Sequence, residues 1–147
     1  MADADVVDQE CVEGYLFVDR PRRYLVLRRR PDRDRIWVPV SGKVEASDRD
    51  FPAAVRREIA EETGFAELDG LIDLDWSYAF EGPGGGRWRL HAFGAEVPTA
   101  EAPKLSREHE QFAWLAFDDA LERLHYADNR EALRRLESWL VPSMPAH

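Results

Sequence analysis

The sequence has little of several features that define common classes of protein. It contains one cysteine, Cys11, and four scattered histidines, so it can form no internal disulfide and has no zinc-binding pattern. It has no run of about 18 apolar residues that could span a membrane. Residues 1–10 are acidic and lack the apolar core of a signal peptide. We therefore expect a cytoplasmic protein without a membrane partner, with Cys11 buried or half-buried in the first strand.

Lysine is scarce as well, and the basic residues are unevenly placed. The net charge of −9 argues against binding a nucleic-acid polymer. Many of the arginines lie close together between residues 20 and 35. A general bias of the composition toward arginine explains this cluster as well as phosphate binding does. We favour a phosphate-binding role only for Arg28, since a guanidinium group binds phosphate through paired N–H donors. The cluster consists of Arg20, Arg22, Arg23, Arg28, Arg29, Arg30, Arg33 and Arg35.

The length of 147 residues and an apolar content of 44 % fit one globular domain, residues 1–147, with loose tails at 1–10 and 142–147. Runs of strand-forming residues predict strands near 12–18, 24–28, 36–40, 68–80, 87–97 and 108–115. A glycine-rich turn at 82–86 joins two of these strands into a hairpin. Two further helices are expected, one capped by Asp118 and one that starts near Asp128 or Asn129, ends at Pro142 and buries Trp139.

Residues 42–65 combine a loop, a helix and a stop signal. Asp50 is a favourable N-cap, and Pro52 suits the first helical turn, where its missing N–H is not needed. Gly64 suits the left-handed position that ends a helix. These signals predict a helix from residue 51 or 52 to Thr63.

Three carboxylates share one face of this helix. At 100° per residue, Glu61 and Glu62 lie about 60° and 40° to either side of Glu58. Three neighbouring negative charges repel one another and need a cation to balance them. Mg²⁺ is a natural candidate because it binds carboxylates and substrate phosphates while keeping some of its water ligands. A solvated face with an ordinary Arg57–Glu61 ion pair is the alternative, and the glutamates alone do not decide between the two.

The full stretch resembles the signature of the Nudix hydrolases, G-x5-E-x7-R-E-U-x-E-E-x-G-U, in which U is a bulky apolar residue. Residues 57–65, Arg-Glu-Ile-Ala-Glu-Glu-Thr-Gly-Phe, fit the second half at every fixed position. The first half departs, because the arginine follows Gly42 by fifteen positions where the family has fourteen. The first Glu of the pattern therefore falls on Asp48 counted forward and on Arg49 counted backward, with Asp50 adjacent. The sequence leaves open which aspartate, if either, replaces it.

The resemblance implies an α/β (α+β) fold, namely a Nudix-type α/β/α sandwich with a mixed sheet and the signature as a loop, helix and loop. It implies a metal-dependent pyrophosphohydrolase, an enzyme acting on phosphorus-containing acid anhydrides with Mg²⁺ or Mn²⁺ as cofactor. Its expected small-molecule substrate is a nucleoside diphosphate linked to another moiety, such as a nucleoside or pterin triphosphate or a dinucleoside polyphosphate. Dimers are frequent in the family, so a homodimer is one expected assembly.

The resemblance also implies roles for single residues. The expected metal ligands are Gly42 through its carbonyl, Glu58, Glu61, Glu62 and Glu108. The expected catalytic residues are Glu61, Glu108 and Arg57, the last by ion pairing with a carboxylate of the signature. The expected substrate-binding residues are Arg28 and Trp37. Glu110 is the alternative to Glu108, because both flank His109 ahead of an aromatic strand.

Two details of the sequence point to different substrates within the family. Residues 37–42 and the Asn129-Arg130 pair are similar to dihydroneopterin triphosphate pyrophosphatases, whereas Glu108-His109 and the helical tail are similar to bis(nucleosyl) tetraphosphate hydrolases. A non-catalytic nucleotide or metabolite sensor on the same scaffold is the alternative function. The three intact glutamates favour the enzyme. A third reading, an interaction domain that uses the arginine cluster, predicts no dependence on metal.

Overall fold

Within residues 6–141, which the computed structural model describes, seven strands form one mixed sheet around β1 (Gln9–Val18). This strand runs parallel to β6 and antiparallel to β2 and β4. β5 pairs with β6, and β3 and β7 pair with β2. The remaining strands are β2 (Arg23–Arg29), β3 (Trp37–Val38), β4 (Val40–Lys43), β5 (Gly70–Glu81), β6 (Arg87–Glu96) and β7 (His109–Leu115).

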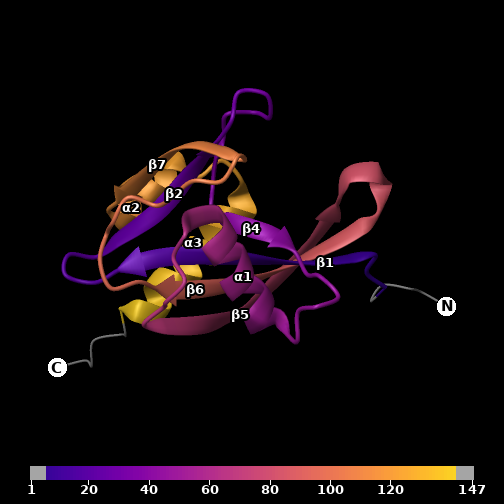
Figure 1. Ribbon diagram of the computed structural model, residues 1–147, viewed down its shortest axis with the longest axis horizontal. Coiled ribbons are helices and arrows are strands. Elements are labelled where there is room, and N and C mark those ends of the chain that lie inside the picture. Colours follow the sequence, from indigo (N-terminus) through magenta and orange to yellow (C-terminus); the bar gives the residue numbers. More distant parts are fainter. Residues whose placement is uncertain (1–5, 142–147) are drawn as a thin grey trace.

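Helices cover both faces of the sheet, as Figure 1 shows. On one face α1 (Phe51–Thr63) buries Val55 and Ile59 completely against side chains of β1, β2 and β6. On the other face α2 (Phe117–Arg123) and α3 (Ala127–Leu140) bury residues such as Leu133 against the opposite side of the same strands. The α/β/α sandwich with a mixed sheet is therefore confirmed.

The ends of α1 follow the local signals in the sequence. The Asp50 carboxylate accepts the Ala53 N–H at 2.8 Å, which satisfies a donor left free by the helix. Gly64 ends the helix at φ 80°, and its N–H donates to the Ala60 carbonyl. The predicted span to Thr63 is confirmed, and it fixes which side chains the helix presents to the sheet.

The sheet divides beside β1, and this division makes room for the site. β1 pairs with β2 only through Phe17 and Val18, whereas its residues Cys11 to Gly14 pair with β4. β2 continues instead with β3 and β7. The two halves of the sheet therefore separate toward the N-terminal part of β1. Cys11 is buried there in the first strand, as expected.

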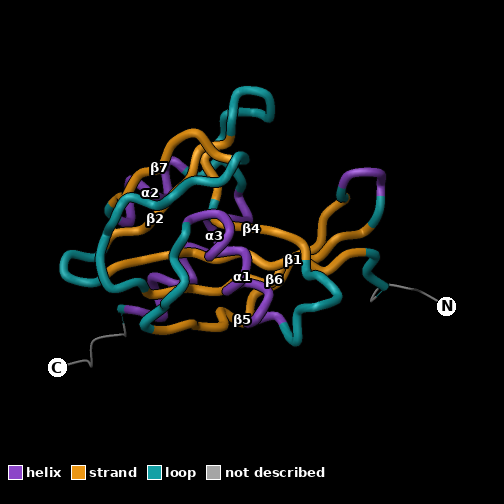
Figure 2. The backbone as a smooth tube through the Cα atoms, viewed as in Figure 1, coloured by secondary structure: helices purple, strands orange, loops and turns teal. Residues whose placement is uncertain are grey.

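The long loop of residues 97–108 carries the chain from β6 across the end of α1 to β7 (Figure 2). It is held to α1 by the Lys104 N–H, which donates to the Thr63 carbonyl at 2.8 Å. Farther on, the Trp114 indole N–H of β7 donates back to the Glu101 carbonyl at 2.8 Å. This path brings Glu108, at the end of the loop, toward the last turn of α1.

Several sequence-based boundaries need correction. Gln9 and Glu10, assigned to a loose tail, begin β1 and pair with β6. The helix α2 starts at Phe117 with Ala116 at its cap, so Asp118 lies in the first turn instead. Trp139 is 61 % exposed because it points away from the face of α3 that carries Leu136. Pro142, expected to end the last helix, lies outside the described residues.

Candidate active site

The site is centred on Glu62, which lies in the last turn of α1 and is only 3 % exposed. One carboxylate oxygen lies 3.9 Å from Nε2 of His109. Glu62, Glu108 and His109 each offer a ligand atom, and these atoms lie within 4.8 Å of one another. A residue of the signature helix thus meets two residues that follow it by more than 40 positions.

Arg57 ties the signature helix to the loop before it. Its Nε and Nη2 donate to the two oxygens of Asp48, each at 2.9 Å, and Nη2 also donates to the Lys43 carbonyl at 2.9 Å. Its Nη1 donates to Glu58 at 2.8 Å and to Glu61 at 3.1 Å. The paired donors fix the plane of the guanidinium group. Arg57 therefore holds two carboxylates of the signature in place.

Gly42 is required by the close approach of Glu58 to its backbone. A Cβ built at this position would lie 2.0 Å from the Glu58 carboxyl carbon. Gly42 is itself fixed by its place in β4, opposite Val12 of β1. The carboxylate of Glu58 therefore packs directly on the strand, in the space that any side chain at this position would fill.

Electrostatics at the site favour a bound cation. Burial, followed by the neighbouring Glu58 carboxyl and the charge of Glu108, raises the pKa of Glu62 well above its ordinary value. Burial also raises the pKa of Glu58. Burial lowers the pKa of His109 to about 4, so its ring is neutral at pH 7. Among the described residues Glu62 thus faces only a neutral ring and other acids, whereas Glu58 has a positive partner in Arg57.

Asp48 shows the opposite behaviour, because Arg57 stabilises its charged form. The hydrogen bonds from the guanidinium group, with a smaller contribution from the Glu45 backbone N–H, lower the pKa of Asp48 to about 2. The same hydrogen bonds raise the pKa of Arg57. Asp48 therefore stays ionised at every pH at which the protein is expected to work.

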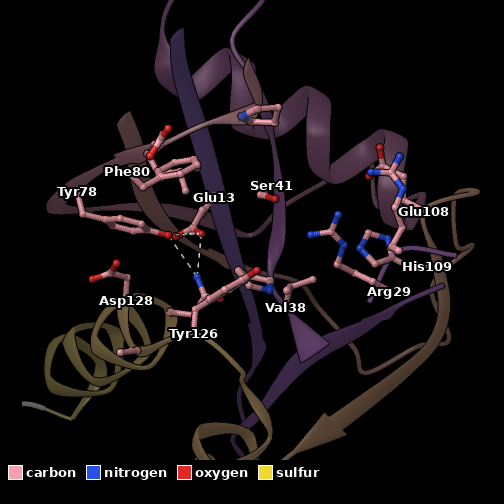
Figure 3. A pocket seen from close by; sticks show the side chains of 17 residues that line it. Glu13, Arg29, Val38, Ser41, Tyr78, Phe80, Glu108, His109, Tyr126 and Asp128 are labelled. Atoms are coloured by element: carbon pink, nitrogen blue, oxygen red, sulfur yellow. Dashed lines mark hydrogen bonds between the residues drawn. The ribbon is translucent and has the colours of Figure 1, made fainter. Parts of the chain in front are cut away.

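A cavity of about 640 Å³ opens next to these acids, a volume typical of small-molecule sites. Figure 3 shows Glu108, His109 and Arg29 at one end, and Glu13, Tyr78, Phe80 and Asp128 at the other. Its walls come from both halves of the divided sheet and from the start of α3. The cavity is therefore open to a ligand longer than a single ring.

The predicted residues are only partly brought together. Arg28 does not line the cavity; its guanidinium group binds Glu110 at 2.8 Å and contacts Gln111. Trp37 is partly buried and packs against the core, with the Arg123 guanidinium group of α2 4.8 Å above its ring. Glu61 is 55 % exposed at its side chain and contacts Arg57.

Other residues line the cavity without having been singled out. Arg29 lies next to the predicted Arg28, and Arg33 comes from the same cluster. Side chains alternate along a strand, but the sequence does not say which face of β2 meets the cavity, and the pairing of β2 with β7 shifts its register between Arg28 and Arg29. The sequence contained one indication that Glu13 is functional, because an acidic residue within an otherwise apolar strand is costly to bury.

The donors fit a divalent metal ion. One oxygen of Glu62 is buried without a hydrogen-bond partner, and so is Nδ1 of His109. Buried carboxylates of this kind are normally paired or bound to metal. Glu58, Glu62 and Glu108 supply the oxygen ligands that Mg²⁺ and Mn²⁺ prefer.

Comparison with known proteins agrees with the fold. A family model described as the NUDIX domain matches residues 12–136. A solved dihydroneopterin triphosphate pyrophosphohydrolase from Escherichia coli is 27 % identical, with a TM-score of 0.75 over 86 % of this chain and 92 % of that one. A Caenorhabditis elegans Ap4A hydrolase in a binary complex is 22 % identical, with a TM-score of 0.75 over 92 % and 98 %.

A curated relative from Myxococcus xanthus, named octanoyltransferase, is 36 % identical over 116 residues. The match covers 77 % of this chain but 32 % of the relative, so the chain spans about a third of that protein's length.

The chain therefore belongs to the Nudix family. The sequence-based assignment to the Nudix family is confirmed. Among residues 6–141, no helix has both the length and the apolar character needed to cross a membrane.

Proposed function

We propose that the protein is a metal-dependent pyrophosphohydrolase that cleaves a phosphoanhydride bond in a nucleoside diphosphate linked to another moiety. Candidate substrates are a nucleoside triphosphate, a pterin triphosphate and a dinucleoside polyphosphate. The observation that carries the proposal is the approach of Glu62, Glu108 and His109 to within 4.8 Å at one end of the cavity. Mg²⁺ or Mn²⁺ is the proposed cofactor.

In this proposal the acidic residues hold the metal and the basic residues hold the phosphates. Glu58, Glu61 and Glu62, with the Gly42 carbonyl and Glu108, bind the divalent ion, which when bound neutralises phosphate charge and lowers the pKa of water. Arg57 positions Glu58 and Glu61 through the hydrogen bonds described above. Glu108 accepts a proton from the attacking water, because it is exposed and reaches the cavity.

Arg29 takes the phosphate-binding role that the sequence favoured for Arg28. It lines the cavity beside Glu108 and His109, whereas the guanidinium group of Arg28 is occupied by Glu110. Arg33, also in the lining, supplies a second cation for a polyphosphate. Trp37 has no proposed contact with the substrate, because its ring packs against the core.

A non-catalytic sensor is the second candidate. A structural relative, the NUDIX domain of Shewanella oneidensis NrtR complexed with ADP ribose, shares the fold at 16 % identity and a TM-score of 0.75. The complete set of Glu58, Glu61 and Glu62 favours the enzyme, since binding a nucleotide does not require three clustered acids.

The test is phosphate and pyrophosphate release from a panel of substrates, each with Mg²⁺ and with chelator. The panel holds nucleoside triphosphates, dihydroneopterin triphosphate, dinucleoside polyphosphates and nucleotide sugars. Release that requires metal supports the enzyme, and the best substrate assigns the subclass. Binding of nucleotides without turnover of any panel member would support the sensor instead.

A further inference from the structure

The end of the cavity away from Glu108 is built around the carboxylate of Glu13, which is 3 % exposed (Figure 3). Three side chains donate to it. Tyr15 donates its hydroxyl to one oxygen at 2.9 Å, and Tyr78 and Asn129 donate to the other at 2.8 and 2.9 Å. The network joins β1, β5 and α3 at the cavity wall, so its geometry is fixed before any ligand arrives.

Glu13 is a buried acid, yet all three side chains that donate hydrogen bonds to it are uncharged. A carboxylate has about four acceptor positions, of which three are filled by these protein donors. The Tyr78 oxygen, which donates to Glu13 and accepts from Asn129 at 3.4 Å, keeps one lone pair. With its donors committed to Glu13, this network presents hydrogen-bond acceptors to the cavity.

Aromatic and apolar surface flanks these acceptors. Phe80 and Tyr126 line the cavity and are 36 % and 47 % exposed, which is unusual for large side chains of this type. Tyr78 and Phe80 lie side by side with ring centroids 6.3 Å apart. Val38 and Leu90 complete the apolar lining. This end therefore fits a flat heteroaromatic ring.

The charges along the cavity orient such a ligand. Asp128 lies at the Glu13 end and Glu81 is also in the lining, whereas Arg29 lies at the Glu108 end. A phosphate chain is repelled from the first end and attracted to the second. The ring is therefore expected to bind at Glu13 and the phosphates beside Glu108.

We propose that Glu13 and Tyr78 select rings that carry a 2-amino-4-oxopyrimidine edge, as guanine and pterin do. This edge places a ring N–H next to an amino group, so two donors meet the two free acceptors of Glu13 and Tyr78. Adenine and cytosine present an amino group beside a ring acceptor, and hypoxanthine lacks the amino group. The inference rests on the proposed function, since it names the ring of the same phosphoanhydride substrate.

The experiment compares kcat/KM for GTP, ITP, ATP and dihydroneopterin triphosphate with Mg²⁺ at about pH 8.5, where Glu13 is ionised although burial raises its pKa to about 7. ITP differs from GTP only by the missing 2-amino group, and we expect GTP to exceed it by about 10–100-fold. Glu13→Gln and Tyr78→Phe should each bring the GTP to ITP ratio close to one. Glu131→Gln is the matched control, because Glu131 pairs with Arg135 on α3 away from the cavity, and it should keep the wild-type ratio. Whichever of GTP and dihydroneopterin triphosphate has the higher kcat/KM identifies the preferred ring as guanine or pterin.

Equal kcat/KM for GTP and ITP in the wild type would overturn the inference while leaving the proposed function intact. An unchanged ratio in folded Glu13→Gln, or in Tyr78→Phe where the first variant fails to fold, would overturn it too. Should no nucleotide be turned over, the proposed function fails separately. Calorimetric binding of GMP and IMP in chelator then decides the inference: tighter binding of GMP supports it, and equal binding contradicts it.

Discussion

Arg57 and Asp48 form a two-pronged ion pair, in which Nε and Nη2 each donate to one carboxylate oxygen at 2.9 Å. This contact answers the question left by the extra residue in the signature. Asp48, found by counting forward from Gly42, faces the arginine, whereas Asp50 caps the helix through the Ala53 N–H. We therefore propose that the insertion falls after Asp48, between the ion pair and the helix.

Neighbouring aspartates should accordingly give different phenotypes. We expect Asp48→Asn to lower kcat/KM by about 10–100-fold with little loss of folding, because Arg57 loses the partner that orients it. Asp50→Ala should destabilise the protein by about 1 kcal/mol and leave turnover per folded molecule near the wild type. Steady-state kinetics and urea unfolding of both variants separate the two roles, and identical behaviour would refute the assignment.

Gly42 should be intolerant of even one added carbon. In Gly42→Ala the Cβ would displace the Glu58 carboxylate, which it would approach to 2.0 Å, and we expect kcat/KM to fall by about 100-fold. Gly70→Ala is the control, since the nearest atom to its Cβ is 4.0 Å away. Kinetics with Mg²⁺ titration would show the effect. Wild-type activity of Gly42→Ala would mean that Glu58 is not held against β4.

Of the two acids that flank His109, Glu108 should be needed for catalysis and Glu110 should not. Glu108→Gln is expected to lower kcat by at least about 100-fold, as the loss of a catalytic base does. Glu110→Gln weakens an ion pair with Arg28 in which the side chains are 21 % and 25 % exposed, so stability should fall by about 1 kcal/mol and kcat should stay close to the wild type. A larger loss of kcat in Glu110→Gln than in Glu108→Gln would reverse the assignment.

Glu13 should make stability fall as the pH rises. Burial raises its pKa from 4.5 to about 7, so between these values the folded protein holds a proton that the unfolded chain has released. The stability of Glu13→Gln relative to the wild type should therefore grow by up to about 3 kcal/mol from pH 4.5 to 7.5. Glu58 and Glu62 are common to both proteins, so their titration cancels in this difference. Urea unfolding across this range is the measurement, and a constant difference would contradict a buried, proton-holding Glu13.

Local signals predicted α1 well, because its cap and its stop depend on residues within the helix and next to it. Asp50 and Gly64 act through contacts with Ala53 and Ala60, a few residues away. Local signals could not assign a role to Asp48, because the extra residue makes the alignment counted forward from Gly42 as good as the one counted backward from Arg57. Only the position of the Arg57 guanidinium group in space distinguishes them.

Contacts between distant elements were the least predictable part of the candidate site. Arg28 was chosen over Arg29 without a way to know which face of β2 meets the cavity. The sequence pattern predicts a buried Trp139, whereas α3 buries Leu133 and Leu136 and leaves Trp139 exposed. The network around Glu13 brings together residues up to 116 positions apart, a proximity that no local pattern encodes.

The most direct test of the metal-dependent hydrolase is a reaction in H₂¹⁸O with the substrate that is turned over fastest in the panel above. The masses of the products are then measured by mass spectrometry. The account predicts one ¹⁸O atom in one phosphate product, formed by the wild type with Mg²⁺ and lost both in chelator and in Glu62→Gln. Folded Glu62→Gln that still incorporates the label at the wild-type rate, or wild-type turnover undiminished by chelator, would contradict a metal-dependent hydrolase centred on Glu62.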